Sequence, residues 1–293
     1  MNGKLFKDFC TFSKYQLKSR DIDPTYPILR AVYKARRLGV EDALWYTCLF
    51  VTFYNIASAE IAFKRFPRVQ SIGGLRLPTG TERRGFRGND HASEHILDLV
   101  SKAPLRGWVE SLIGISDSQE VRWRNVRDEY QKFKFCGPWA SYKFADLMKW
   151  VHKFDITADD LGVGGGSATA GPIPGLVKLT GRDWKDCAFN MELHHQVLQE
   201  CMESGVDFNG LDQLETCLCD FNSMLCGRYY PGKDIDEQQD FLTKSTVDMS
   251  VFWQCRIEAF DHRFLGELGG WSGVRKDLRG YYVSHQEVYN PWL

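Results

Sequence analysis

The sequence lacks several features that would identify a function at once. No G-x-x-x-x-G-K-[ST] pattern occurs in its 293 residues, which excludes a P-loop kinase. Net charge is almost absent, because 37 Lys and Arg residues oppose 38 Asp and Glu residues, and this argues against a histone-like or tail-driven nucleic-acid binder. Residues 1–30 carry Lys and Asp throughout and show no apolar leader. With nine cysteines, an odd number, the expectation is a cytoplasmic protein with reduced thiols.

Extended alternation of polar and apolar residues is also missing, so a large β-sheet is not expected. Helical spacing is common instead, and residues 211–225 carry one apolar stripe, formed by Leu211, Leu214, Leu218, Phe221 and Leu225. The one long apolar run, residues 43–63, contains Asn55, Ser58 and Glu60, which favours a buried core helix over a membrane span. The chain is therefore predicted to be mainly α. It forms either a single catalytic domain over residues 1–293 or two lobes that meet near residues 155–175.

Although the net charge is small, basic and acidic residues are concentrated in different segments of the chain. Two segments are basic: residues 64–87 contain seven basic residues and one acidic residue, and residues 122–153 contain eight basic and three acidic residues. Residues 212–240 are acidic, with seven acidic and two basic residues. Within the first segment, residues 78–88 place Arg83, Arg84 and Arg87 among glycines that let a ligand approach the backbone closely. Guanidinium groups bind phosphate through paired hydrogen bonds, so this segment is a candidate phosphate site. A solvated basic loop is the alternative.

Two further patterns bear on nucleic-acid and metal binding. Residues 171–176, GPIPGL, are predicted to form a glycine-bounded turn of the kind that presents backbone N–H groups to a DNA phosphate, with a plain loop as the alternative. The GVGGGS segment from Gly162 does not follow a buried strand, which argues against a dinucleotide site. His91 and His95 are four residues apart without an evident third ligand, so a surface pair is expected and no metal site is predicted.

Three carboxylates are candidates for acid–base chemistry. Asp146 lies within a predicted aromatic helix, residues 139–154, where a charged group needs a partner or a chemical role. Glu215 and Asp220 lie on the predicted helix 211–225, whose other face is apolar. Exposed carboxylates on a helix are usually only solvated, and the sequence leaves the choice among the three open.

Five segments, in their order and spacing, resemble the motif series of the phage amino acid:DNA transferases, which are also called α-glutamyl/putrescinyl-thymine pyrophosphorylases. The segments are FYNIASAE (53–60), LPTGTERRGFRG (77–88), CGPWASYKFADL (136–147), AGPIPGL (170–176) and LETCLCDF (214–221). The resemblance covers roughly residues 40–225 and leaves the segment after residue 240 unassigned. It implies a helical fold related to the helix-hairpin-helix DNA glycosylases, although GPIPGL departs from the tighter G-P-G turn expected there.

The resemblance also implies a reaction on double-stranded phage DNA. A separate kinase would first convert 5-hydroxymethyluracil in the DNA to a pyrophosphoryl ester, and an amine, either an amino acid or a polyamine, would then displace pyrophosphate. We expect one of the three carboxylates to deprotonate the amine. We expect Arg83, Arg84 and Arg87 to stabilise the departing pyrophosphate in the same pocket. No cofactor is implied, although a divalent metal ion could accompany the pyrophosphate.

The remaining site residues are expected to handle the DNA. A base inside a duplex is difficult to attack, so it is expected to flip into a pocket where Tyr54 or Trp139 stacks on it and Asn55 binds the uracil edge. Contacts with the DNA backbone are expected from four residues, Lys143, Gly171, Gly175 and Lys178. A DNA glycosylase of the same broad fold and a non-catalytic DNA-binding protein are the alternatives. The identity of the amine stays open, because the acidic residues 212–240 suit a polyamine whereas the arginines suit an amino-acid carboxylate.

Overall fold

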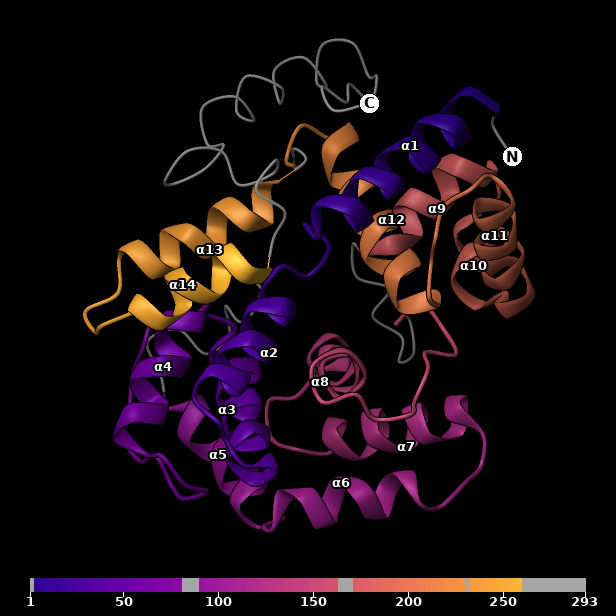
Figure 1. Cartoon of the computed structure of the whole chain (residues 1–293). Helices are drawn as coiled ribbons and strands as arrows, with labels where there is room; N and C mark the ends of the chain where they lie inside the picture. Colours follow the sequence, from indigo (N-terminus) through magenta and orange to yellow (C-terminus); the bar gives the residue numbers. More distant parts are fainter. Residues whose placement is uncertain (1–2, 81–89, 163–170, 230–231, 260–293) are drawn as a thin grey trace. The chain divides into compact units, whose positions relative to one another are not determined.

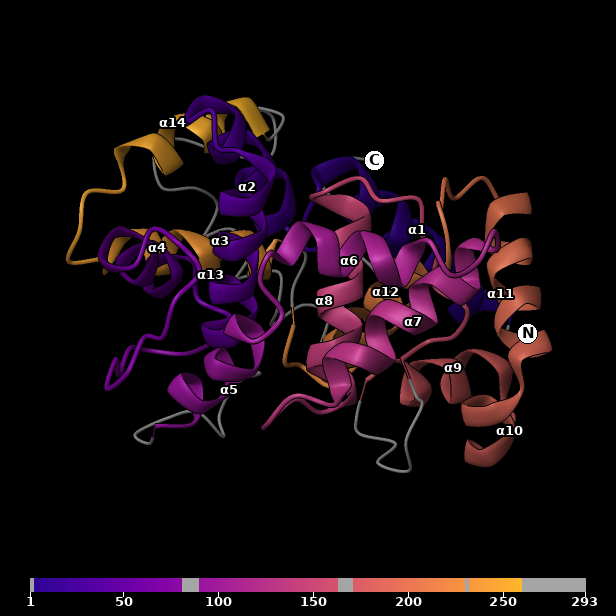
Figure 2. The same ribbon diagram turned by 90° about the horizontal axis from the view of Figure 1, so that it is seen from below.

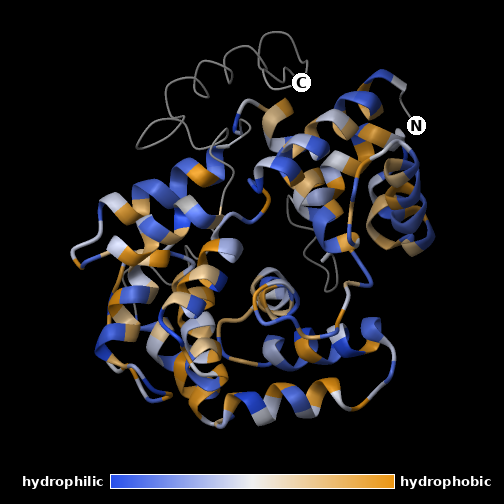
Figure 3. Ribbon diagram, viewed as in Figure 1, coloured by the Kyte–Doolittle hydropathy of each residue, from blue (hydrophilic) through white to orange (hydrophobic). Residues whose placement is uncertain are grey.

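A computed structural model of the chain describes residues 3–80, 90–162, 171–229 and 232–259. These residues form fourteen helices and no strand (Figure 1), which confirms the mainly α prediction for the described part of the chain. They divide into two compact units. Unit 1 comprises the described residues up to Pro24 together with Ala158–Glu237, and unit 2 comprises Thr25–Thr157 together with Gln238–Ala259. Figure 3 shows that most helices carry both hydrophobic and hydrophilic residues.

Unit 2 is built mainly from consecutive helices, to which a distant segment of the chain is added. Its helices are α2 (Thr25–Ala35), α3 (Val40–Phe53), α4 (Ile56–Arg65), α5 (His91–Val100), α6 (Leu105–Ile113), α7 (Gln119–Gln131), α8 (Pro138–Trp150) and α14 (Ser250–Ala259). Helix α14 packs on α2, and α8 packs on α7 and α3 (Figures 1 and 2). Helix α13 (Lys233–Thr243) begins within unit 1 and ends within unit 2.

Unit 1 contains α1 (Gly3–Ser19), α9 (Pro172–Thr180), α10 (Trp184–Phe189), α11 (Met191–Glu203) and α12 (Leu211–Leu225). Helix α12 contacts α1, α9 and α11, and its bounds agree with the prediction from its apolar stripe. Phe221 of this stripe is fully buried and meets the rings of Phe9 and Phe12 at centroid distances of 5.3 and 5.5 Å. The stripe therefore forms the core of unit 1, as amphipathic spacing predicts.

The long apolar run is not one helix, and that prediction was wrong. Helix α3 ends at Phe53, Tyr54 adopts a left-handed conformation with φ 46°, and α4 begins at Ile56. The Asn55 side chain accepts a hydrogen bond from the Ser58 backbone N–H at 3.1 Å, so Asn55 caps the new helix. Among the described residues, no helix is both long and apolar enough to cross a membrane.

The turn predicted at residues 171–176 is likewise part of a helix. Helix α9 starts at Pro172, where the missing N–H of proline costs nothing because the first turn of a helix has unpaired N–H groups anyway. Pro174 falls in the same turn and is tolerated for the same reason. The helix ends at Gly181, whose φ of 70° suits glycine.

A buried ion pair ties four helices of unit 2 together. Glu60 of α4 is fully buried, and both of its oxygens accept hydrogen bonds at 2.8 Å from the guanidinium of Arg36, which directly follows the end of α2. The Tyr46 hydroxyl of α3 donates to the same carboxylate at 3.0 Å. Burial, followed by the charge of Glu60, raises the pKa of Tyr46 well above its ordinary value. The Arg36 guanidinium also lies over the Phe252 ring of α14, at 5.3 Å from its centroid.

Candidate active site

One face of α8 carries an aromatic ring, a cation and a carboxylate. Trp139, Lys143 and Asp146 are spaced four and three residues apart, which places them on the same side of the helix. Asp146 is only 1% exposed. Its Oδ2 atom accepts a hydrogen bond from the Tyr26 hydroxyl at 2.9 Å and lies 3.6 Å from the Lys143 Nζ atom. These two contacts are partners of the kind that a buried carboxylate needs.

The two aromatic residues predicted to stack on a base are neighbours in unit 2. The Tyr54 and Trp139 rings meet edge to face, with centroids 4.7 Å apart and an interplanar angle of 80°. Both side chains are half-buried. Because Trp139 shares its helix face with Asp146, an aromatic surface and a buried carboxylate belong to one side of α8.

Asn55 lies directly after Tyr54 and caps helix α4. Its side-chain oxygen is used in capping α4, as described above. Its amide nitrogen has no hydrogen-bond partner within the described ranges, so a donor is left over for a ligand. The structure therefore gives Asn55 a structural role without excluding the predicted contact with a base.

The segment that leads to the three arginines starts at this same place. Arg83, Arg84 and Arg87 lie outside the described residues. The chain just before them is held by two hydrogen bonds, from the Ser58 hydroxyl to the Pro78 carbonyl at 2.6 Å and from the Gly80 N–H to the Phe53 carbonyl at 2.9 Å. These bonds attach the start of the arginine segment to the α3–α4 junction that carries Tyr54 and Asn55.

Glu215 and Asp220 belong to unit 1, whereas Asp146 belongs to unit 2. Glu215 is 9% exposed and accepts a hydrogen bond from the Thr216 hydroxyl, which also reaches Asp23, both at 3.2 Å. Asp220 accepts a hydrogen bond from the Gln16 side chain at 3.1 Å. The contacts of Thr216 with Asp23 and of Asp220 with Gln16 join α12 to the N-terminal segment of unit 1, which is a structural use for Asp220.

The residues expected to contact the DNA backbone lie in different surroundings. Lys143 is 8% exposed and paired with Asp146, so its contacts favour a role beside that carboxylate over a contact with a phosphate on the outer surface. Gly171 precedes the first turn of α9 and is half-exposed. Lys178 is exposed on α9, and its Nζ atom donates to the Asn222 side chain of α12 at 2.8 Å.

Gly175 has a packing role in the contact between α9 and α12. A Cβ atom at this position would lie 2.6 Å from the Leu218 carbonyl oxygen, a backbone atom that cannot rotate away. We expect Gly175→Ala to lower the free energy of unfolding by about 1–3 kcal/mol, because the two helices must separate to admit a methyl group.

Gly107→Ala in α6 is the matched control for this prediction. A Cβ atom at Gly107 meets nothing closer than 3.7 Å, so alanine should be neutral or stabilising there. Urea unfolding of the two variants measures the difference, and equal stabilities would contradict the packing role of Gly175.

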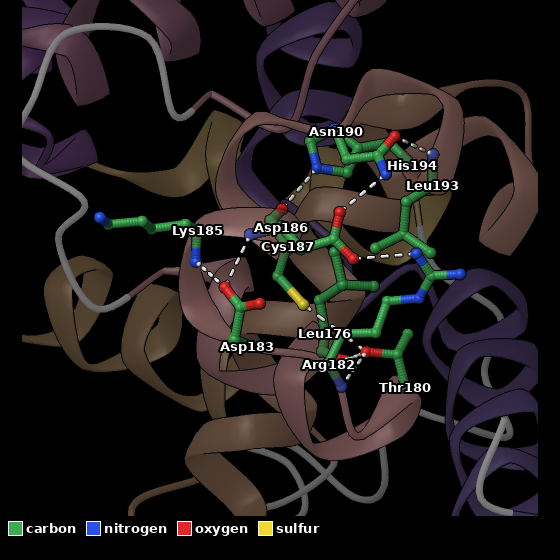
Figure 4. A network of polar contacts seen from close by, with 10 residues as sticks. All are labelled: Leu176, Thr180, Arg182, Asp183, Lys185, Asp186, Cys187, Asn190, Leu193 and His194. Carbon is green, nitrogen blue, oxygen red and sulfur yellow. Dashed lines mark hydrogen bonds and ion pairs between the residues drawn. The ribbon is translucent and has the colours of Figure 1, made fainter.

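The helices after α9 are fixed by their own polar side chains (Figure 4). Asp183 caps α10 by accepting hydrogen bonds from the Lys185 and Asp186 N–H groups at 2.8 and 3.0 Å. Asn190 caps α11 through the Leu193 N–H at 3.1 Å. The two caps fix the starts of α10, which packs on α9, and of α11, which packs on α12.

The two histidines of α5 do not form the surface pair that was predicted. His95 is fully buried, and its two ring nitrogens lie 2.9 Å from the Lys134 carbonyl and 3.0 Å from the Tyr130 hydroxyl. Sequence spacing could not reveal this, because the partners come from α7 and the residues after it. In the part of the chain that the structure describes, no group of three or more His, Cys, Asp or Glu side chains could hold a metal ion.

Comparisons with known proteins identify the family to which the chain is similar. Residues 62–230 match the sequence model of a family described as amino acid:DNA transferase. A glycinyltransferase of Pseudomonas phage PaMx11 is 26% identical over 164 residues, which cover 52% of this chain and 54% of that protein. The chain thus spans about half the length of this curated relative. Trp139, Lys143 and Asp146 all fall within the residues matched by the family model.

Proposed function

Because this chain belongs to the amino acid:DNA transferase family, we propose that it transfers an amine to a thymine derivative in phage DNA in the host-cell cytoplasm. The substrate is 5-(pyrophosphoryloxymethyl)uracil, made beforehand by a 5-hydroxymethyluracil DNA kinase, and pyrophosphate is the leaving group. The observation that carries the proposal is the buried Asp146 with its Tyr26 and Lys143 partners, on the face of α8 that also carries Trp139.

In this proposal Asp146 accepts the proton that the ammonium group of the amine must lose before it attacks. The nitrogen lone pair then forms a bond with the methylene carbon of the modified base. The carbon–oxygen bond breaks, and pyrophosphate leaves with the electron pair. Arg83, Arg84 and Arg87 stabilise the charge that develops on the pyrophosphate. Glu215 and Asp220 are the weaker candidates for the base because they lie on α12 and do not share a helix with Trp139 and Lys143.

The proposed handling of the DNA assigns some residues to the target base and others to the phosphates. The target base flips out of the duplex, stacks on Tyr54 and Trp139 and receives a hydrogen bond from the free amide nitrogen of Asn55. Lys178 and the backbone near Gly171 contact the phosphates. A relationship to the helix-hairpin-helix glycosylases is supported by α9 and α10, two helices in contact through a short connection at Gly181.

The proposed amine is an amino acid, and glycine is the first candidate because the phage relative is a glycinyltransferase. A polyamine is the alternative, suggested by the acidic residues 212–240. A small amino acid presents both an ammonium group for Asp146 and a carboxylate for an arginine, so it suits both charges of the proposed site.

Mass spectrometry of digested DNA tests this function. DNA that contains 5-hydroxymethyluracil is treated with the matching kinase and ATP, and then with this protein and a pool of glycine, other amino acids and polyamines. The proposal predicts a new nucleoside whose mass contains one amine in place of pyrophosphate. Abasic sites in place of that nucleoside would indicate a glycosylase, and binding with no change in nucleoside mass would indicate a DNA-binding protein.

We expect Arg84→Ala to lower the rate of transfer by about 10²–10³-fold, because a charge-stabilising donor acts mainly in the transition state. The dissociation constant for duplex DNA should change much less. Arg76→Ala, which removes an exposed arginine earlier in the same basic segment, is the control and should leave the rate nearly unchanged. Equal losses in rate and binding for Arg84→Ala would mean that this arginine only holds the DNA.

A further inference from the structure

An exposed aromatic residue sits in the connection between α7 and α8. Phe135 is 43% exposed although it is large and apolar, and it adopts a left-handed backbone conformation with φ 59°. Both features are unfavourable for a phenylalanine, because the side chain is in water and the backbone region disfavours residues with a Cβ atom. Such a residue persists only where its surroundings enforce the conformation, and this points to a use other than stability.

The surroundings of Phe135 hold its backbone firmly. The preceding residue, Lys134, donates its N–H to the Asp98 carboxylate at 2.6 Å, and its carbonyl lies 2.9 Å from the His95 ring. Phe133 is buried and stacks on Trp108 at a centroid distance of 5.5 Å. The backbone contacts of Lys134 and the packing of the Phe133 ring therefore hold the connection in place, while the Phe135 ring is partly exposed at the surface.

The partly exposed Phe135 ring stacks on a second ring. The His91 ring lies parallel to it, with an interplanar angle of 13° and centroids 3.7 Å apart. This is the arrangement that a nucleobase adopts with its neighbours in a duplex, and a half-exposed ring can extend such a stack. Lys132 and Lys134 precede the ring in the same connection, with side chains 70% and 58% exposed, and they pair with Glu129 at 2.7 Å and with Glu94 at 3.8 Å. Residues 122–153 as a whole carry eight basic and three acidic residues, and this excess of positive charge favours a polyanion as the occupant.

We propose that Phe135 is the side chain that enters the DNA duplex and takes the place of the flipped base. This inference rests on the proposed function, and it assigns to this chain the element that base flipping requires, because the gap left in the stack costs free energy unless an apolar group fills it. Trp139 begins the reactive face of α8 only four residues later, so the stack-filling ring and the base-binding ring are parts of one continuous segment of unit 2.

The test uses duplexes that carry 2-aminopurine next to 5-hydroxymethyluracil, which the kinase and ATP first convert to the pyrophosphoryl ester. The fluorescence of 2-aminopurine rises when it is unstacked. We expect the full-length protein to raise this fluorescence. With Phe135→Ala the increase should be smaller than with the wild type by about fivefold or more. Phe135→Tyr, which keeps the ring, should retain it. The control is Ile115→Ala, since Ile115 is also in unit 2 and is 70% exposed but lies outside this connection.

A second readout separates opening of the duplex from chemistry. On single-stranded substrate there is no stack to fill, so the ratio of duplex to single-strand transfer rates should fall about tenfold or more in Phe135→Ala and stay constant in Ile115→Ala. If the wild-type protein unstacks 2-aminopurine but transfers no amine, the proposed function fails and the fluorescence comparison still decides the role of Phe135. Unchanged fluorescence and an unchanged rate ratio in Phe135→Ala would overturn the inference, as would a wild-type protein that never unstacks the probe.

Discussion

Asp146→Asn is expected to lower the single-turnover rate of amine transfer by about 10²–10⁴-fold while the helical content stays unchanged. Asparagine has nearly the same shape as aspartate and can still accept the Tyr26 hydrogen bond, but it cannot take a proton from the ammonium group of the amine. The rate is measured at saturating DNA and amine, and circular dichroism reports the fold. A rate within about twofold of the wild type would remove Asp146 as the base.

The pH dependence of the same variant distinguishes a base from a merely structural residue. At a pH above the pKa of the amine the free base is already present, so Asp146→Asn should recover part of its rate there. Asp220→Asn is the matched control, because it changes a half-buried carboxylate of unit 1 that is hydrogen-bonded to Gln16. Asp220→Asn should keep the wild-type transfer rate at every pH. A large loss of rate in Asp220→Asn, with none in Asp146→Asn, would identify Asp220 as the base.

Glu60→Ala is expected to produce the largest loss of stability, about 3–5 kcal/mol in the free energy of unfolding. The substitution leaves the Arg36 guanidinium, whose side chain is 22% exposed, without its carboxylate, and it leaves the buried Tyr46 hydroxyl without its acceptor. Chemical unfolding followed by circular dichroism measures the change. If the two units unfold separately, the loss belongs to the transition of unit 2.

An exposed ion pair provides the comparison for Glu60. Glu110 pairs with Arg106 on the surface of α6, where the two side chains are 49% and 57% exposed. Because water and salt screen such a pair, Glu110→Ala should cost less than about 1 kcal/mol. If Glu60→Ala cost no more than Glu110→Ala, the Glu60 network would not be what holds α2, α3 and α4 together.

The parts of the fold that follow from local spacing were predictable. The five apolar residues of α12 define a complete helix face, and the predicted bounds agree with those observed. The break between α3 and α4 was not found, because apolar residues continue on both sides of it and the signal is limited to one capping residue, Asn55. Likewise, two prolines and two glycines suggest a turn at residues 171–176, whereas the first turn of a helix accepts the prolines.

In the candidate site, too, features that depend on neighbouring residues were predictable, whereas contacts between residues distant in the sequence were not. A carboxylate in an aromatic helix, Asp146, was recognised from the sequence as needing a partner. Its partner Tyr26 was missed, because the two residues are 120 positions apart and only the packing of α2 on the unit brings them together. Ser58 was noted only as a polar residue in an apolar run, and its bond to the Pro78 carbonyl explains why a hydroxyl belongs there.

The most direct measurement is the ratio of pyrophosphate released to nitrogen incorporated, using ¹⁵N-labelled amine and kinase-treated DNA. If an amine replaces pyrophosphate at one carbon atom, the two amounts rise together in a ratio of one to one and no abasic sites form. Release of pyrophosphate without incorporation of nitrogen would show hydrolysis, and release of a free base would show glycosylase chemistry. Either result would contradict amine transfer as the reaction of this chain.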